Sequence, residues 1–202
     1  MPMSSYQQTL RALRPIITPV FESIKKGLNA ANQAHGPGGF SRRRDPHYYA
    51  HTVRRTAADV LREQGLLAEA DQSDRPELGL SGLLIRHDGV ALRILRSGLS
   101  AAGQVVIPIP GRSEARQAFW RQESALPGME ADNILLLWRD EVGELVEPMF
   151  LIRPLGGTYR RDSLIIDWTG RLTSGMAYLR AADLDELQPD MVQGQLGNET
   201  SG

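Results

Sequence analysis

The spacing of the apolar residues changes once along this chain, and this change constrains the fold more than any other feature. Up to about residue 66, apolar side chains recur every three or four residues, which is the period of a helix that packs on one side. From about residue 78 they alternate with polar residues or form short continuous runs, which is typical of strands. A chain that groups its helices before its strands predicts an α+β fold.

Two helices are expected in the first part of the chain. Thr18 and Pro19 form a start signal for the first helix, a capping residue followed by a proline. Asp45 and Pro46 repeat this signal for the second helix, and Gly65 stands where a left-handed C-terminal cap is expected. These signals place both helices before the strand region.

The rest of the chain predicts a mostly antiparallel sheet with one inserted helix. The clearest signal is Asp88-Gly89, because this dipeptide between two apolar runs is typical of a tight β-hairpin. Pro148 lies inside a later run and indicates an edge strand or a bulge. Strands are expected over residues 80–86, 90–96, 104–109, 133–138, 145–153 and 163–168, and helices over 113–123 and 181–187. Thr169-Gly170 is expected to turn out of the last strand.

The composition narrows the chemistry that the chain can perform. The 202 residues contain no cysteine and two lysines, Lys25 and Lys26, so nearly all of the 23 basic side chains are arginine. Thiolate catalysis, disulfides and thiolate metal sites are therefore excluded. No apolar run approaches the roughly 20 residues of a membrane span, and the N-terminus does not resemble a secretory signal. We expect a cytoplasmic protein that makes no use of a membrane.

The predicted organisation is one compact unit with three parts. A helical region covers residues 1–69, a sheet domain covers 78–187, and a polar tail over 188–202 is expected to be disordered. Residues 1–75 carry 11 basic and 7 acidic side chains, whereas residues 128–202 carry 6 and 13. This asymmetry is typical of a chain whose basic end faces a polyanion, and equally of one whose two ends attract each other or a neighbouring subunit.

The start of the second helix is the first candidate site. Arginine offers a planar fork of donors to phosphate, and tyrosine or histidine can stack on bases. His47 and His51 share a helix face, but Tyr48 stands where a zinc protease needs a glutamate, so no metal is expected. We predict a polyanion-binding set made of Arg42, Arg43, Arg44, His47, Tyr48, His51, Arg54 and Arg55.

The turn that precedes the inserted helix is the second candidate site. Gly111, Arg112 and Ser113 lie in this turn, and free backbone N–H groups at a helix start can bind an anion beside an arginine. The segment lacks the spacing and the lysine of a phosphate-binding P-loop. It predicts a simple anion site.

If the protein is an enzyme instead, its catalytic residues would be carboxylates. The order of the predicted elements is similar to that of the PD-(D/E)xK nucleases, with Asp88 in the position of the first acid. The strands that follow lack the acid-x-lysine pair, so the resemblance implies a divergent metal-dependent nuclease or phosphoesterase, or an inactive relative. Asp167 lies in an apolar strand and is expected to form an ion pair with an arginine such as Arg153 or Arg171.

These observations favour a non-enzymatic binding or regulatory protein that contacts nucleic acid or an acidic protein partner. No catalytic residue and no cofactor are expected. The remaining alternative is an interaction subunit whose first helix docks on a partner helix through Val20, Phe21, Ile24 and Leu28. Nucleic acid and an acidic protein both stay open as ligands at this point.

Overall fold

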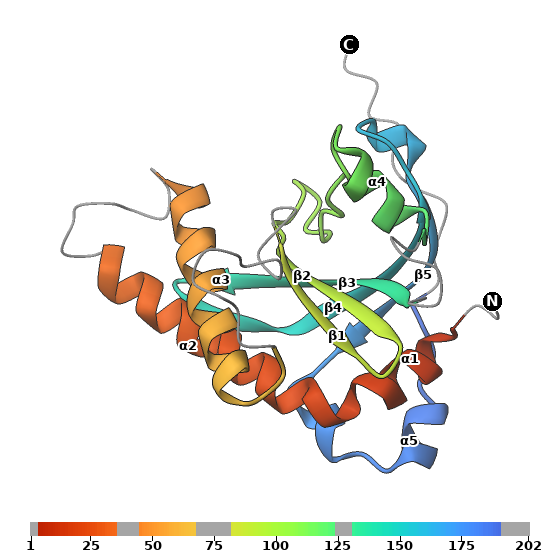
Figure 1. Ribbon diagram of the computed structural model, residues 1–202, viewed down its shortest axis with the longest axis horizontal. Coiled ribbons are helices and arrows are strands. Elements are labelled where there is room, and N and C mark those ends of the chain that lie inside the picture. Colours follow the sequence, from red (N-terminus) through yellow and green to blue (C-terminus); the bar gives the residue numbers. More distant parts are fainter. Residues whose placement is uncertain (1–3, 36–44, 68–81, 124–130, 191–202) are drawn as a thin grey trace.

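The computed structural model describes residues 4–35, 45–67, 82–123 and 131–190. It confirms the α+β class, because helices at the N-terminus precede a five-stranded, mostly antiparallel sheet into which one helix is inserted (Figure 1). Helices α1 and α2 cross one face of this sheet, and α4 stands on the other side (Figure 1). No helix in these ranges is long and apolar enough to cross a membrane.

The first two helices form one nearly continuous segment. Helix α1 (Tyr6–Leu13) leads through a 3-10 turn (Arg14–Ile16) directly into α2 (Ile17–His35). With Thr18 as the cap, the helix is expected to begin at Pro19; it begins two residues earlier, at Ile17, and Thr18 lies inside it. Pro19 still falls in the first turn of α2, where a missing N–H is tolerated.

Helix α3 (Pro46–Glu63) begins and ends as the sequence predicts. The Asp45 carboxylate accepts a hydrogen bond from the Tyr48 backbone N–H at 2.9 Å, which caps the first turn. Gly65 has a φ of 73°, and the N–H of Leu66 donates to the Leu61 carbonyl at 2.9 Å. This is the Schellman arrangement that a glycine permits without strain.

The sheet has the strand order β1-β2-β3-β4-β5. All neighbouring pairs are antiparallel except β2 and β3, which are parallel and are joined by a crossover that contains α4 (Glu114–Trp120). The Asp88-Gly89 hairpin is confirmed, with positive φ at both residues. The strands are β1 (Leu83–His87), β2 (Val90–Arg96), β3 (Asp132–Glu141), β4 (Glu144–Gly156) and β5 (Ile165–Leu172).

Two strand predictions need correction. Residues 104–109 form no strand and make one bridge, between Val105 and Leu99. Pro108 and Pro110 explain this, because neither has an N–H to donate to a ladder. Strand β5 continues through Gly170 instead of turning there, because this glycine makes room for a ring of α1, as described below.

Pro148 marks a bulge. Strand β4 lies between β3 and β5, so it is not an edge strand, and its register with β3 shifts between Leu137 and Arg139, opposite Pro148. Of the two predictions for Pro148, an edge strand or a bulge, the bulge is confirmed.

Short helical elements flank β5. One 3-10 turn, Arg161–Ser163, precedes this strand. A second 3-10 turn, Ser174–Tyr178, and the short helix α5 (Ala181–Asp185) follow it. Asp190 forms a bridge with Thr169 of β5, so the first residues of the expected tail are paired. Residues 191–202 of that tail lie outside the described part of the chain.

Two apolar clusters cover the two faces of the sheet. The larger joins α1, α2 and α3 to alternate residues of the strands, such as Leu92 and Leu136. The smaller lies beneath α4 and contains Phe119 and Trp120. The apolar stripe proposed for partner docking belongs to the larger cluster, since its residues are at most 2% exposed: Val20, Phe21, Ile24 and Leu28.

Candidate polyanion-binding site

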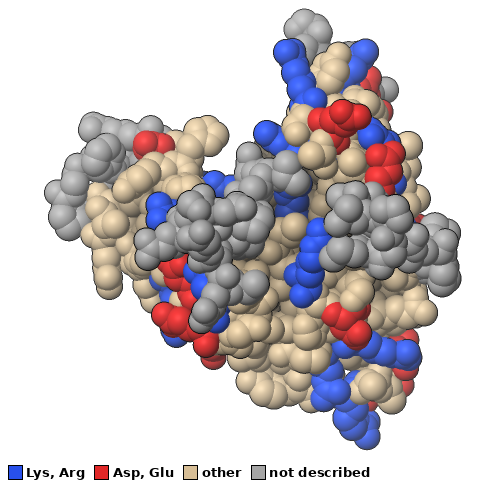
Figure 2. All heavy atoms as spheres, viewed as in Figure 1, with Lys and Arg blue, Asp and Glu red and all other residues tan. Residues whose placement is uncertain are grey.

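A hollow separates α3 from α4 on the surface of the molecule. Lys and Arg atoms lie on both sides of it (Figure 2). On the α3 side, a pocket of about 270 Å³ opens between the first half of α3 and the ends of β2 and β3. Its lining residues are His47, Ala50, Arg54, Leu95, Arg96 and Trp138.

Helical periodicity decides which side chains of α3 reach this pocket. His47, Ala50 and Arg54 are spaced by three and four residues, so they lie on one face and line the pocket. Tyr48 and Arg55 are turned to a neighbouring face. The aromatic ring of Tyr48 lies 4.8 Å from that of His35, on the side of α2.

Three arginines from different elements, α3, β2 and α4, lie close enough for their charges to act on one another. Arg93 of β2 is 4% exposed, and its guanidinium lies 5.4 Å from the centre of the Phe119 ring. Burial, followed by the charges of Arg116 and Arg54, lowers the pKa of Arg93 to about 10. Arg93 therefore stays positive at neutral pH. We call Arg54, Arg93 and Arg116 the arginine cluster.

Two hydrogen-bond donors of the cluster have no acceptor among the residues that the structure describes. The Nε atoms of Arg54 and Arg116 are buried, and neither has an acceptor within the described ranges. Burial also lowers the pKa of Arg54. Buried donors without acceptors carry a desolvation cost.

Arg96 has a different role. Its guanidinium donates from Nε to the buried carboxylate of Asp140 at 3.1 Å, and it lies over the rings of Tyr49 and Trp138. This arginine holds α3 against the ends of β2 and β3. It therefore positions Arg54 instead of offering a free charge to a ligand.

Helix α4 is fixed to the sheet by a glutamine that ends it. Gln122 has a φ of 59°, a conformation usually left to glycine, and closes α4 with the backbone bonds of a Schellman motif. Its side-chain amide donates to the carbonyls of Asn133 at 2.8 Å and Pro154 at 2.6 Å, and its oxygen accepts from the Asn133 N–H. These three bonds set the position of α4, and with it that of Arg116.

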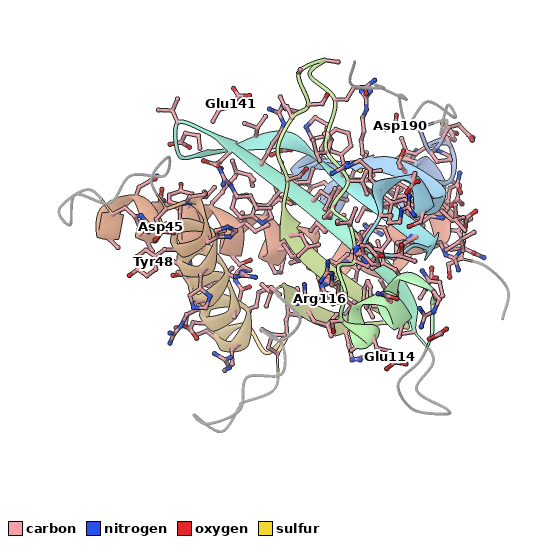
Figure 3. The ribbon with its side chains drawn as sticks, turned by 90° about the horizontal axis from the view of Figure 1, so that it is seen from above. Asp45, Tyr48, Glu114, Arg116, Glu141 and Asp190 are labelled. Atoms are coloured by element: carbon pink, nitrogen blue, oxygen red, sulfur yellow. The ribbon has the colours of Figure 1, made fainter. Side chains whose placement is uncertain are left out.

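The second predicted site lies close to the cluster. Gly111 has a φ of 77°, and the Arg116 Nη1 lies 3.3 Å from the point where a Cβ of Gly111 would stand. Arg112 itself lies over the ring of Tyr159, and Ser113 precedes α4 without a side-chain capping bond. The turn that the sequence singled out thus touches the cluster through Arg116, on the α3 side of α4 (Figure 3).

The eight residues predicted at the start of α3 are divided by the structure. Arg42, Arg43 and Arg44 lie outside the described residues. His47 and Arg54 line the pocket, whereas Tyr48 and Arg55 are turned away from it. His51 is exposed, and partial burial, followed by Arg54 and Arg55, lowers its pKa.

Sequence reasoning missed Arg93 and Arg116. Arg93 carried a signal, because it is the one charged residue within the otherwise apolar residues 90–95. A buried arginine there must serve a packing or binding purpose. Arg116 carried no comparable signal, since an arginine on a short surface helix is common.

The carboxylates considered for catalysis are used in other ways. Asp167 forms the predicted ion pair with Arg153, at 2.9 Å, and Asp132 pairs with the same arginine at 2.8 Å. Asp88 is exposed in the β1–β2 turn. Within the described ranges, no group of three or more histidines or carboxylates is placed to hold a metal ion.

Comparisons with protein-family models, curated proteins and solved structures found no match for this chain.

Proposed function

We propose that this chain is a cytoplasmic, non-catalytic protein that binds nucleic acid in the hollow between α3 and α4. The proposal rests on one observation, the convergence of Arg54, Arg93 and Arg116 from a helix, a strand and a second helix. Local positive charge of this density attracts polyanions even in a chain whose net charge is −1. If the protein is regulatory, the nucleic acid that it binds would decide which process it regulates.

Nucleic acid fits this site better than an acidic protein does. All three cationic groups of the cluster are guanidinium groups, which match the paired oxygens of a phosphate and are more weakly hydrated than an ammonium. The wall contributed by α3 adds His47, and three further arginines (Arg42, Arg43 and Arg44) precede that helix in the sequence. A row of cationic groups suits a repeating chain of phosphates.

The test measures how salt changes binding. A labelled single-stranded oligonucleotide is titrated with the wild type and with Arg54→Gln/Arg116→Gln by fluorescence anisotropy at several salt concentrations. We expect weaker binding by the double variant, and a log–log salt slope that is shallower by about 0.7 for each phosphate contact removed. The matched control is Arg171→Gln/Arg180→Gln, which removes the same charge from two arginines outside the hollow, 65% and 84% exposed.

Three results would contradict the proposal. If the wild-type protein does not bind the oligonucleotide at low salt, nucleic-acid binding is wrong. Equal salt slopes for the two double variants would show that binding occurs elsewhere on the surface. Displacement of the oligonucleotide by an equal charge concentration of polyglutamate would identify an acidic protein as the better ligand.

A further inference from the structure

A second pocket, of about 360 Å³, opens where α1 joins α2. The chain that follows β5 runs below this junction (Figure 1), and its 3-10 turn Ser174–Tyr178 contacts α2 and the turn between the two helices. The volume lies within the range of small-molecule sites, roughly 300–1,000 Å³. We call this cavity the junction pocket, and its lining residues are Arg11, Arg14, Pro15, Thr18, Ala177 and Tyr178.

The two arginines of the junction pocket differ in their partners. Arg11 donates from Nε to the Asp185 carboxylate at 2.7 Å, so α5 balances its charge. Arg14 pairs with no carboxylate among the described residues, and its side chain makes one long hydrogen bond there, 3.5 Å from Nε to the Ala177 carbonyl. Within this part of the chain, solvent or a ligand must therefore supply the acceptors for the terminal N–H groups of Arg14.

Tyr178 is an exposed aromatic residue on a turn that is fixed to the sheet. Ser174 begins this turn, and its N–H and its hydroxyl both donate to the Glu147 carboxylate of β4 at 2.9 Å. Met176 and Ala177 pack against the larger apolar cluster. The side chain of Tyr178 stays outside, 78% exposed, at the wall of the junction pocket. A tyrosine held in this way offers a large flat surface at a low cost in conformational entropy.

We propose that the junction pocket binds a small aromatic ligand that carries a carboxylate or phosphate group. The planar fork of Arg14 holds the oxyanion, because a guanidinium matches its paired oxygens. The ring of Tyr178 stacks on the aromatic part of the ligand. The charge that attracts the ligand is that of Arg14, since the charge of Arg11 is balanced by Asp185.

Binding is measured by a heteronuclear NMR titration of the full chain with naphthoate, naphthyl phosphate and the uncharged naphthamide. We expect saturable shifts of the backbone amide signals of Arg14, Thr18 and Ala177, which line the pocket. At least one of the two anions should bind about tenfold more tightly than naphthamide, because its hydrogen bond to Arg14 is charge-assisted. The tighter of the two anions shows whether the site prefers a carboxylate or a phosphate.

Two positions separate the roles of the charge and the ring. Arg14→Gln should lower the affinity for the anions to that for naphthamide, whereas Arg14→Lys should keep part of the difference. Tyr178→Ala should weaken the binding of all three probes. The matched control is Tyr159→Ala/Arg160→Gln, which removes the same two kinds of side chain outside the pocket, 52% and 68% exposed, and should bind like the wild type. The dispersion of the amide signals shows whether each variant is folded.

A further variant should increase the affinity. Asp185→Asn removes the carboxylate that balances Arg11, so the pocket gains a second uncompensated guanidinium. We expect the anions to bind about two- to fivefold more tightly and naphthamide to bind as before. An unchanged or lower affinity for the anions would overturn the role assigned to charge in this pocket.

Three other results would overturn the proposal. The first is the absence of saturable shifts with either anion. The second is equal affinity of the wild type for the anions and for naphthamide. The third is a set of shifts centred outside the junction pocket. None of these results would affect the proposed nucleic-acid binding, because no residue of the junction pocket lines the pocket beside α3.

Discussion

At the scale of single residues, two buried arginines of this chain, Arg153 and Arg93, have different surroundings. Arg153 is 5% exposed and donates to Asp132 and Asp167, so its charge is balanced within the chain. Arg93 is equally buried, and this burial, followed by the charges of Arg116 and Arg54, lowers its pKa. The first arrangement is typical of a structural ion cluster. The second places three arginines close enough for their charges to act on one another, and polyanion-binding sites use such groups of arginines.

Replacing Arg153 by methionine tests the first arrangement. Arg153→Met leaves two partly buried carboxylates without their partner, so we expect it to lower the free energy of unfolding by about 3–5 kcal/mol at neutral pH. Chemical denaturation measures this change. The control is Arg160→Met, whose partner Asp162 and own side chain are about 70% exposed, and which should cost about 0–1 kcal/mol.

The pH dependence of this loss has a definite sign. Burial raises the pKa of Asp132, although Arg153 opposes the shift. On acidification, the folded chain therefore takes up this proton before the unfolded chain does, and the group stabilises the fold as the pH falls through its raised pKa. In Arg153→Met, the same proton neutralises a carboxylate that has lost its partner. The deficit should shrink in that pH range, and a constant deficit would contradict this account.

At the scale of elements, α4 is short and depends on the sheet for its position. Seven residues are too few for a stable isolated helix, so contacts outside the helix must hold it. Gln122 supplies these contacts to β3 and β4, and Asn133 returns a hydrogen bond from its side chain to the Phe119 carbonyl at 3.0 Å. The position of Arg116 on the wall of the hollow depends on these bonds.

The substitution Gln122→Gly tests how much the side-chain hydrogen bonds of Gln122 stabilise the fold, because it keeps the backbone conformation. Gln122→Gly keeps the positive φ and removes the three side-chain bonds, so we expect a loss of about 1–3 kcal/mol in unfolding free energy. Gln104→Gly, in an exposed loop, is the matched control. Oligonucleotide affinity should fall for Gln122→Gly as α4 loosens. Unchanged stability would show that α4 is held by its apolar contacts alone.

At the scale of the whole molecule, the first helix is tied to the last strand. Tyr6 is buried, its hydroxyl donates to the Arg171 carbonyl, and its ring lies 5.5 Å from that of Trp168. Burial, with a contribution from Asp190, raises the pKa of Tyr6 to about 12, so the hydroxyl keeps its proton. These contacts tie the first described helix to the last strand of the sheet.

Gly170 is the position at which this closure can be tested. A Cβ on Gly170 would collide with the ring of Tyr6, so Gly170→Ala should overpack the interface and cost about 1–3 kcal/mol. The control is Gly98→Ala, where the added Cβ meets open space. Far-UV circular dichroism and tryptophan fluorescence should report one shared unfolding transition at lower denaturant. Two separate transitions would show that the ends of the chain unfold independently.

The sequence by itself determined the features that depend on neighbouring residues. The cap of α3 at Asp45, its end at Gly65 and the hairpin at Asp88 are decided by backbone preferences over a few residues, so local reading found them. The change of apolar period identified the α+β class for the same reason. Proline supplied one further local signal, the bulge at Pro148.

Only the tertiary structure decided the contacts between distant segments. Arg54, Arg93 and Arg116 come together because the chain crosses from β2 to β3 through α4 and because Arg96 holds α3 at the ends of these strands. The sequence predicts a turn at Gly170. In the structure, the missing side chain of this glycine lets the ring of Tyr6 pack against β5. Pairings over such distances depend on the packing of whole elements, which no short stretch of residues specifies.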